Sequence, residues 1–203
     1  MGKMNLLKAK WDGKVGQTVG AKWKNLATIR TYAKPSNPNT SAQQTIRGGF
    51  KQVTSFVALF SDLIRYHSSL DTRGQSVRNA IISANRAQIV AGSITKADLI
   101  VNKGGLPNVT AASIGTPAAG TNITLTYTKP VATNITAKAK IVAVAVDEEN
   151  KIAGVGVGAL ADETVEIAMA PLAGATVDVY YWVIDYRGSA RVGSYSGYLT
   201  ASV

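Results

Sequence analysis

The side chains that most often perform chemistry are scarce in this sequence. It holds no cysteine and a single histidine, His67. The lack of cysteine excludes disulfides, thiolate zinc sites, iron–sulfur clusters and cysteine nucleophiles, and one histidine is too few for a multi-histidine metal site. His67 falls at the end of a predicted helix with no nucleophile turn nearby, so we expect a positive charge that caps this helix. We therefore expect a protein that is not an enzyme and that has no cofactor and no metal.

Two further motifs and one tryptophan have structural interpretations. The acidic residues 147–149 stand in a predicted hairpin turn and lack the spacing of a calcium-binding loop. The glycines of 154–158 alternate with valine, but no strand–turn–helix context surrounds them, which argues against a phosphate-binding loop. Trp182 alternates with Tyr180 and Ile184 in a predicted strand, so we expect these three side chains to share one buried face.

Basic and aromatic side chains interleave near the N-terminus and are candidates for binding a partner. Lysine and arginine beside aromatic rings suit the backbone and bases of a nucleic acid. They suit equally an arm that lies on an acidic protein surface, and the sequence leaves both partners open. The candidate partner-binding residues of this stretch are Lys14, Lys22, Trp23, Lys24, Arg30 and Tyr32.

Charge is distributed unevenly along the 203 residues. The net charge is +10, from 22 Lys and Arg and 12 Asp and Glu, and 15 of the basic but only four of the acidic residues lie in residues 1–98. A basic half predicts an anionic partner, whereas a near-neutral half, residues 99–203, suits exposure. The opening MGKMNLLKAKW carries lysines too often for a signal peptide, and no apolar stretch approaches the roughly 20 residues of a membrane span. We therefore expect a chain made in the cytoplasm with no membrane partner.

The basic half is predicted to contain a β-hairpin followed by two helices. Residues 14–20 and 27–32 alternate like strands. Thr40 or Ser41 can cap a first helix, and the pair Gly48-Gly49 near its start indicates close packing or a bend. Apolar residues then recur in alternating steps of four and three, the spacing of a packed helical seam, at Ile46, Phe50, Val53, Val57, Phe60 and Ile64. A second helix has an apolar face made by Val77, Ile81, Ala84 and Ile89.

Residues 121–203 are predicted to form an immunoglobulin-like β-sandwich. Short strands separated by turn signals are typical of this fold, and they are expected at 123–128, 137–146, 152–157, 164–169, 177–185 and 191–199. Residues 97–101 are a further strand candidate, and residues 99–120 are a linker or an ordered edge segment. The expected fold class is α+β: a basic hairpin and helical anchoring module over residues 1–98, then this linker or edge segment, then a self-contained sandwich.

Three segments resemble an uncharacterised family that is widespread in Bacteroidota. Residues 13–32, which read GKVGQTVGAKWK and then IRTY, are similar to the family opening G-K-V-G-x-V-x-G-x-x-W-(K/R)-G followed by (I/M)-R-S-x-P. Residues 37–50 resemble the helix start N-P-x-T-x-A-Q-x-x-x-R-x-x-F of this family and of many phage structural proteins, which adds Arg47 and Phe50 to the candidate partner-binding residues. Residues 177–198 resemble the closing β-hairpin of the family. Asn25 and the displaced proline at Pro35 depart from the pattern.

The resemblance and the charge distribution together predict a non-enzymatic virion structural protein of phage type. We expect a capsid-associated auxiliary, decoration or fibre-base protein that docks through its basic N-terminal half and displays its sandwich. Its partners would be other virion proteins or further copies of itself, and no small-molecule substrate is expected. Three alternatives stay open: a nucleic-acid-binding protein that uses the basic arm, a tail or neck component, and an adhesin carried on a particle.

Overall fold

The computed structural model describes residues 13–23, 26–34, 36–70, 74–92, 94–188 and 190–203. The chain divides into two compact units, Met1–Thr40 and Ser41–Val203. Helices and strands both contribute, and the sheets are antiparallel, so the α+β class expected from the sequence is confirmed. In the described part of the chain, no helix is both long and apolar enough to cross a membrane.

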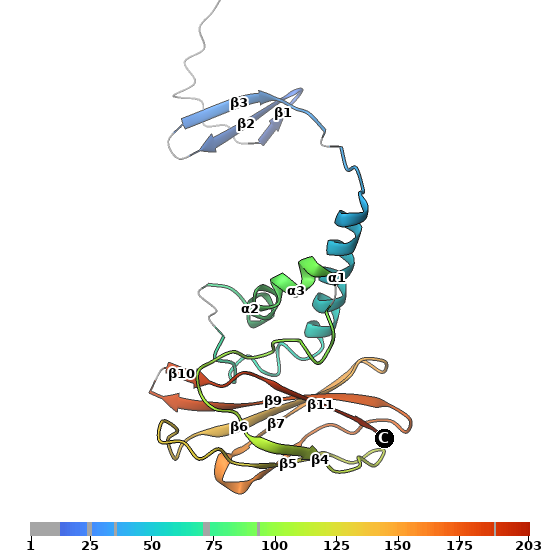
Figure 1. The fold of residues 1–203 in the computed structure, drawn as a ribbon. Helices are drawn as coiled ribbons and strands as arrows, with labels where there is room; N and C mark the ends of the chain where they lie inside the picture. The colour runs from blue at the N-terminus through green and yellow to red at the C-terminus, as the bar shows by residue number, and fades with distance from the viewer. Residues whose placement is uncertain (1–12, 24–25, 35, 71–73, 93, 189) are drawn as a thin grey trace, which may run out of the picture. The chain divides into compact units, whose positions relative to one another are not determined.

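The N-terminal unit contains a three-stranded antiparallel sheet in the order β1-β2-β3 (Figure 1). Its strands are β1 (Gly13–Val15), β2 (Thr18–Trp23) and β3 (Leu26–Thr31). The sequence predicts one strand over residues 14–20, but the chain turns back at Gly16, whose φ of 58° is readily adopted by glycine. This segment is therefore a hairpin of its own, in which Lys14 pairs with Val19.

The second unit is layered, with a large sheet between a set of helices and a small sheet (Figure 1). The large sheet has five strands in the order β10-β9-β6-β7, with β11 also paired to β9, and the small sheet has the order β4-β5-β8. The helices are α1 (Ser41–Ala58), α2 (Val77–Ala84) and α3 (Arg86–Ala91), with a short 3₁₀ turn η1 (Leu160–Asp162). The strands are β4 (Thr110–Ile114), β5 (Ile123–Thr128), β6 (Lys140–Asp147), β7 (Ile152–Ala159), β8 (Thr164–Ile167), β9 (Thr176–Arg187), β10 (Ala190–Gly193) and β11 (Gly197–Ser202).

The two central strands of the large sheet, β6 and β9, are buried on both faces. On one face, Val142 and Trp182 share an apolar core with Phe60 from the helical segment. On the other face, Ile141 belongs to a second core with Leu125 of the small sheet. Burial on both faces explains why β6 is a nearly continuous apolar run rather than an alternating one.

The helical segment belongs to the same unit as the sheets, whereas the sequence predicts a boundary at residue 98. Trp182 is buried with Tyr180 and Ile184 on one face, as predicted, but that face lies against the helices. Because the apolar sides of the helices and of the large sheet meet there, the chain divides after Thr40. Residues 99–203 are thus only part of a unit, and without the helices one face of the large sheet would be open to water.

Most predicted strands of this unit are present, and the differences are local. Residues 97–101 form no strand, because the side chain of Asn85 pairs with the backbone N–H and carbonyl of Ile100 at 2.8 and 2.9 Å. The predicted strand 191–199 is divided into β10 and β11. The segment 99–120 contains β4 at the edge of the small sheet, so of the two predicted alternatives, a linker or an ordered edge segment, the structure has the edge segment.

The glycine repeat of residues 154–158 allows β7 to pass close to the chain around β8. A Cβ atom at Gly154 or Gly156 would collide with the backbone at Ala168 or Glu166. Side chains at these two positions would therefore push the two sheets apart, which gives the repeat a packing role.

Candidate functional site

The first half of α1 extends beyond the apolar core of its own unit. The predicted seam is buried from Val53 onward, with Val53 3% and Val57 0% exposed, whereas Ile46 and Phe50 are 40% and 49% exposed. Figure 1 shows this half of the helix standing clear of the sheets. The seam spacing therefore continues past the point where the core ends.

Exposed residues of α1 form one wall of an apolar groove, and α2 and α3 form the other. The groove has a volume of about 580 Å³. Gly49 brings the helices together, because a Cβ at this position would lie 3.1 Å from the carbonyl oxygen of Ile89, whereas Gly48 has no such neighbour. Close packing thus accounts for one of the two glycines. The apolar lining of this α1 groove comes from Ile46, Phe50, Ile82, Ile89 and Val90.

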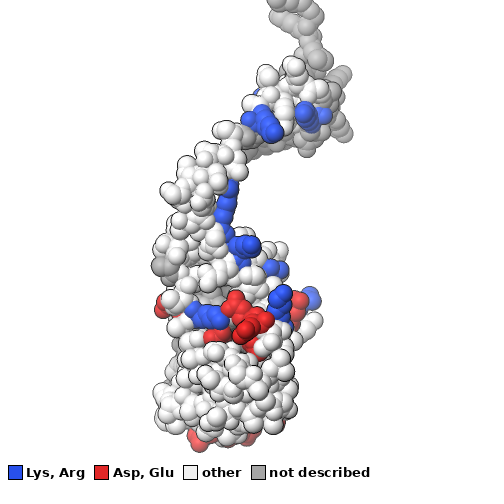
Figure 2. All heavy atoms as spheres, turned by 90° about the vertical axis from the view of Figure 1, so that its right-hand side faces the viewer, with Lys and Arg blue, Asp and Glu red and all other residues white. Residues whose placement is uncertain are grey.

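The charge that the α1 groove presents is basic, because Arg86 is the charged residue among the described residues that line it. Arg78, which lines a neighbouring pocket, donates a 2.9 Å hydrogen bond from its Nη2 to the carbonyl of Thr54 on α1. Figure 2 shows basic side chains over the helical layer and acidic side chains gathered beyond it, near the sheet. An apolar groove with a basic rim can bind an apolar segment that carries acidic side chains. The charged residues of segment 41–91 are Arg47, Lys51, Arg65, Arg73, Arg78 and Arg86 against Asp62 and Asp71.

The N-terminal sheet places three predicted partner-binding residues on one face. Lys14 pairs with Val19, which pairs in turn with Arg30, so these residues form one row across the strands. Tyr32 lies two residues after Arg30, and Lys14 Nζ lies 3.8 Å from the centre of the Tyr32 ring. Such a cation–π contact contributes about 0.5–1 kcal/mol at an exposed site and orders the lysine. The face therefore presents ordered positive charge beside an aromatic ring.

The other predicted partner-binding residues fall into two sets. Arg47 and Phe50 lie on α1 in the second unit, and Phe50 lines the α1 groove. Lys24 lies outside the described residues. For Lys22 and Trp23 the structure describes the backbone pairing in β2, and their side chains lie outside the description.

Sequence reasoning missed the wall that α2 and α3 contribute to the groove. The single predicted helix is divided at Asn85, while its predicted apolar face is buried at Val77 and Ile81. Ile82 and Val90 lie off that face and line the groove instead. Apolar residues on an otherwise polar helix face are the signal that could have revealed this wall.

The surroundings of His67 differ from the predicted positive helix cap. Its Nδ1 lies 2.7 Å from the hydroxyl of Tyr186. Burial, followed by the positive charges of Arg191 and Lys140, lowers the pKa of His67. The neutral imidazole is therefore favoured at pH 7. Within the described ranges, no three His, Asp or Glu side chains are grouped so as to hold a metal ion.

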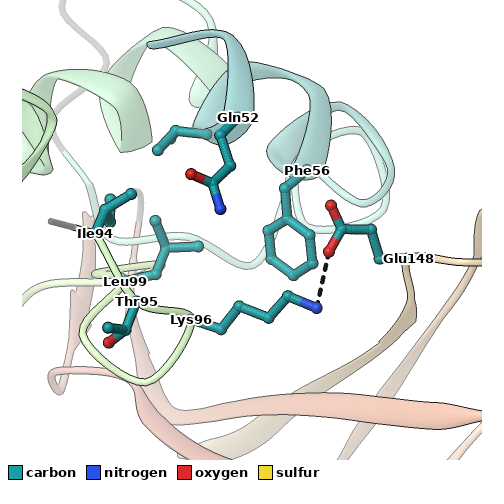
Figure 3. Close-up of a pocket in the computed structure, with 8 residues that line it drawn as sticks. Gln52, Phe56, Ile94, Thr95, Lys96, Leu99 and Glu148 are labelled. Carbon is teal, nitrogen blue, oxygen red and sulfur yellow. Dashed lines mark ion pairs between the residues drawn. The ribbon is translucent and has the colours of Figure 1, made fainter. Parts of the chain in front are cut away.

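A small cleft beside α1 is occupied by an ion-pair network around Lys96 (Figure 3). Lys96 Nζ lies 2.8 Å from Glu148 Oε2, 2.8 Å from Asp178 Oδ2 and 5.3 Å from the centre of the Phe56 ring. Burial acts to lower the pKa of Lys96, but the hydrogen bonds to Asp178 and Glu148 outweigh it and raise the pKa. The remaining volume of about 20 Å³ suits a single water molecule. The network therefore fixes segment 94–99 to the sheet.

A family model matches residues 9–199, a span that includes both the N-terminal sheet and the α1 groove. The chain belongs to the DUF6266 family. This is a family of unknown function. No curated protein and no solved structure matches the chain. The match to DUF6266 extends over both units. Because the function of this family is unknown, the function of the chain has to be inferred from its surfaces.

Proposed function

We propose that the protein is a non-enzymatic structural component of a phage-type virion, which it joins by docking its α1 groove on an acidic partner protein. The proposal rests on one observation: the apolar seam of α1 is buried at Val57 but exposed at Phe50, in a segment rich in basic residues. The resemblance of residues 37–50 to phage structural proteins supports the virion assignment. A capsid-associated auxiliary, decoration or fibre-base position fits this arrangement best.

Docking would bury apolar surface that the isolated chain exposes. Ile46, Phe50 and Val90 are 40%, 49% and 54% exposed, and all three line the same groove. Complete burial of an apolar side chain contributes roughly 1.5–3 kcal/mol, so covering the exposed parts of three contributes on the order of 3 kcal/mol. Burial of these three side chains would therefore supply a substantial part of the free energy of docking.

Charge favours an acidic partner over the two occupants that the chain itself could supply. A second copy of the groove would bring like charges face to face, because the helical segment carries mostly arginine and lysine. The segment 1–12 is also basic, with Lys3, Lys8 and Lys10 against Asp12. An apolar segment with glutamates or aspartates has the complementary charge.

In this proposal the β-layers of the second unit form an immunoglobulin-like sandwich that the particle displays. Two antiparallel sheets enclose a common core that includes Ile141, Val183 and Leu125, which supports the assignment. The helices cover the opposite face of the large sheet, where Trp182 is buried. Display would therefore involve the small sheet and the sandwich loops.

Particles purified from the host on a density gradient and treated with nuclease test the proposal. The wild-type chain should sediment with the particles, and Phe50→Glu should be lost from them while keeping its thermal stability. Tyr195→Glu is the matched control, since Tyr195 is 51% exposed but lies between β10 and β11. Absence of the wild-type chain from particles would overturn the virion assignment, and equal incorporation of Phe50→Glu would overturn the groove as its docking site.

Nucleic-acid binding is the second candidate function, and the face of the N-terminal sheet favours it. Lys14, Arg30 and Tyr32 combine ordered positive charge with an exposed aromatic ring. Size exclusion with light scattering and a 260/280 nm ratio, after nuclease and at low and high salt, separates the two functions. Nucleic acid that elutes with the wild type at low salt, and not with Lys14→Glu/Arg30→Glu, would favour this candidate.

A further inference from the structure

A second pocket of the unit Ser41–Val203 gathers positive charge between the helical segment and the large sheet. Its lining includes residues of β9 and β10, the neighbouring strands labelled in Figure 1, and its volume is about 760 Å³. We refer to it as the basic pocket. Its side chains come from the turn after α1, the start of β6 and the β9–β10 hairpin, and they are Tyr66, His67, Lys138, Lys140, Tyr186 and Arg191.

Strand register positions the floor of the basic pocket. Arg191 pairs with Tyr186, and Lys140 pairs with Ile184, two residues before Tyr186 on the same strand. Lys140, Tyr186 and Arg191 therefore share the face of the large sheet that lies against the helices. His67 meets this face from the helical side, with its Nδ1 2.7 Å from the Tyr186 hydroxyl. The floor of the pocket is thus built on strands of the core, whereas Tyr66, His67 and Lys138 lie in turns.

The described residues that line the basic pocket include no acidic side chain. Arg191 also lines a neighbouring pocket with Asp62 and donates a 3.4 Å hydrogen bond from its Nη1 to the backbone carbonyl of Arg65. Lys138, Lys140 and Arg191 form no ion pair within the described part of the chain, whereas the neighbouring Arg187 lies 2.9 Å from Asp185. After burial, Arg191 and Lys140 are the groups that lower the pKa of His67, so both charges act at the pocket.

We propose that the basic pocket binds a phosphate-class oxyanion, with Lys138, Lys140 and Arg191 as its cationic ligands. Arginine offers a planar fork of N–H donors and lysine a compact charge, and both are regular partners of phosphate in proteins. Three positive charges that line one pocket favour a doubly charged anion over a singly charged one. Tyr66 is 63% exposed and gives the organic part of a phosphorylated ligand an aromatic surface to contact. The site uses none of the residues of the α1 groove and stands independently of the proposed docking function.

His67 supplies the means to test this proposal, because it is the only histidine of the chain. Its imidazole proton resonances can be followed by NMR while the full-length protein is titrated with inorganic phosphate, glucose 6-phosphate or acetate at constant ionic strength. We expect phosphate to shift these resonances saturably and to raise the pKa of His67, since a bound anion offsets the two nearby cations. Acetate, which carries one charge, should bind more weakly.

Substitutions then assign the binding to these residues. Lys140→Gln/Arg191→Gln should weaken phosphate binding by about tenfold or more, since two of the three cations are lost. Lys129→Gln is the matched control, because Lys129 is an exposed lysine after β5 that does not line the pocket, and it should bind phosphate like the wild type. The thermal unfolding of each variant is compared with that of the wild type, so that loss of binding is not loss of fold.

Each outcome decides between binding and its absence. Any of three results would overturn the proposal. The resonance shifts could stay linear with phosphate concentration, they could persist in Lys140→Gln/Arg191→Gln, or acetate could reproduce them at equal concentration. Saturable binding of glucose 6-phosphate that is tighter than that of phosphate, and that weakens in Tyr66→Ala, would support it and assign a phosphorylated organic ligand. Equal binding of the two would support it with free phosphate as the ligand.

Discussion

The indole Nε1–H of Trp182 donates a 2.8 Å hydrogen bond to the backbone carbonyl of His67. Trp182 is fully buried within β9, and His67 ends the turn that follows α1. A tryptophan supplies a large apolar surface and a single donor, so it can fill a core and also satisfy a carbonyl at the rim of that core. This bond therefore attaches the helical layer to the large sheet beside the basic pocket.

Replacing Trp182 with phenylalanine should destabilise the protein by roughly 2–3 kcal/mol. The change leaves a cavity in the core and a partly buried carbonyl at His67 without its donor. Urea denaturation followed by circular dichroism measures the loss. Tyr195→Phe, at a half-exposed position, should stay within about 0.5 kcal/mol of the wild type. A loss of that small size in Trp182→Phe would contradict the role given to the hydrogen bond.

Truncation should show that the independent unit begins near residue 41 rather than 99. Residues 41–203 should fold cooperatively and remain monomeric at low concentration, because they retain both cores. Residues 99–203 should aggregate, since removal of the helices exposes Tyr180 and Trp182. Circular dichroism and light scattering on the two fragments measure this. A monomeric, cooperatively unfolding 99–203 fragment would restore the boundary predicted from the sequence.

The alternation of apolar and polar residues along the chain is sufficient to predict which side chains share one face of a strand. It is not sufficient to predict which layer of the protein covers that face. The strand at 123–128 and the common side of Tyr180 and Trp182 follow from local pattern, because successive side chains of a strand point to opposite faces. Helices and a second sheet are both apolar layers, so the pattern does not distinguish them. The covering layer is decided by long-range packing, which is why the predicted domain boundary differs from the structural one.

The candidate sites were partly predictable for the same physical reason. The seam spacing identified Phe50, but the end of the core depends on how Val53 and Val57 pack against residues far along the chain. The basic pocket gave no sequence signal, because His67 and Arg191 are distant in sequence and meet only through the register of β9 and β10. Local motifs therefore indicated the helical surface and missed the pocket.

The two halves of the α1 seam should respond differently to the same kind of substitution. Val57→Ala should lower the free energy of unfolding by about 2 kcal/mol, because Val57 is fully buried and its removal leaves a cavity. Phe50→Ala removes a larger side chain but should cost less than about 1 kcal/mol, because Phe50 is 49% exposed. Thermal and urea denaturation at low protein concentration measure both. Equal losses would mean that the outer half of the seam is already covered in solution, which light scattering would detect as association.

The Lys96 network should be sensitive to loss of its lysine and tolerant of change at its exposed acid. The side chain of Asp178 is only 3% exposed. In Lys96→Met its carboxylate keeps the hydrogen bond from the Tyr198 hydroxyl but loses the ion pair with the lysine. We expect a loss of roughly 1–3 kcal/mol, reduced by the partial exposure of Lys96. Glu148→Gln should cost less than about 1 kcal/mol, because this pair is 40% and 42% exposed. Similar losses in both variants, measured by urea denaturation, would contradict this assignment.

Acid should destabilise the protein through His67 in the range from pH 7 to pH 5. Burial, Arg191 and Lys140 lower the pKa of His67 in the folded protein, whereas in the unfolded chain it titrates near about 6.5. As the pH falls, the unfolded chain therefore binds a proton first, and the free energy of unfolding decreases below about pH 6.5 until the folded pKa is passed. The stabilisation is fully present above that pH, so the loss appears only on acidification.

The pH window separates His67 from the carboxylates. Hydrogen bonds from Thr136 and Arg187 outweigh burial and lower the pKa of Asp185, so its contribution is lost only as the pH falls below its ordinary value of about 4. Urea denaturation of the wild type and His67→Gln at matched pH values tests the assignment. His67→Gln should remove most of the slope between pH 7 and pH 5 while leaving the decline at lower pH. A slope that is unchanged in His67→Gln would show that another group carries the acid sensitivity.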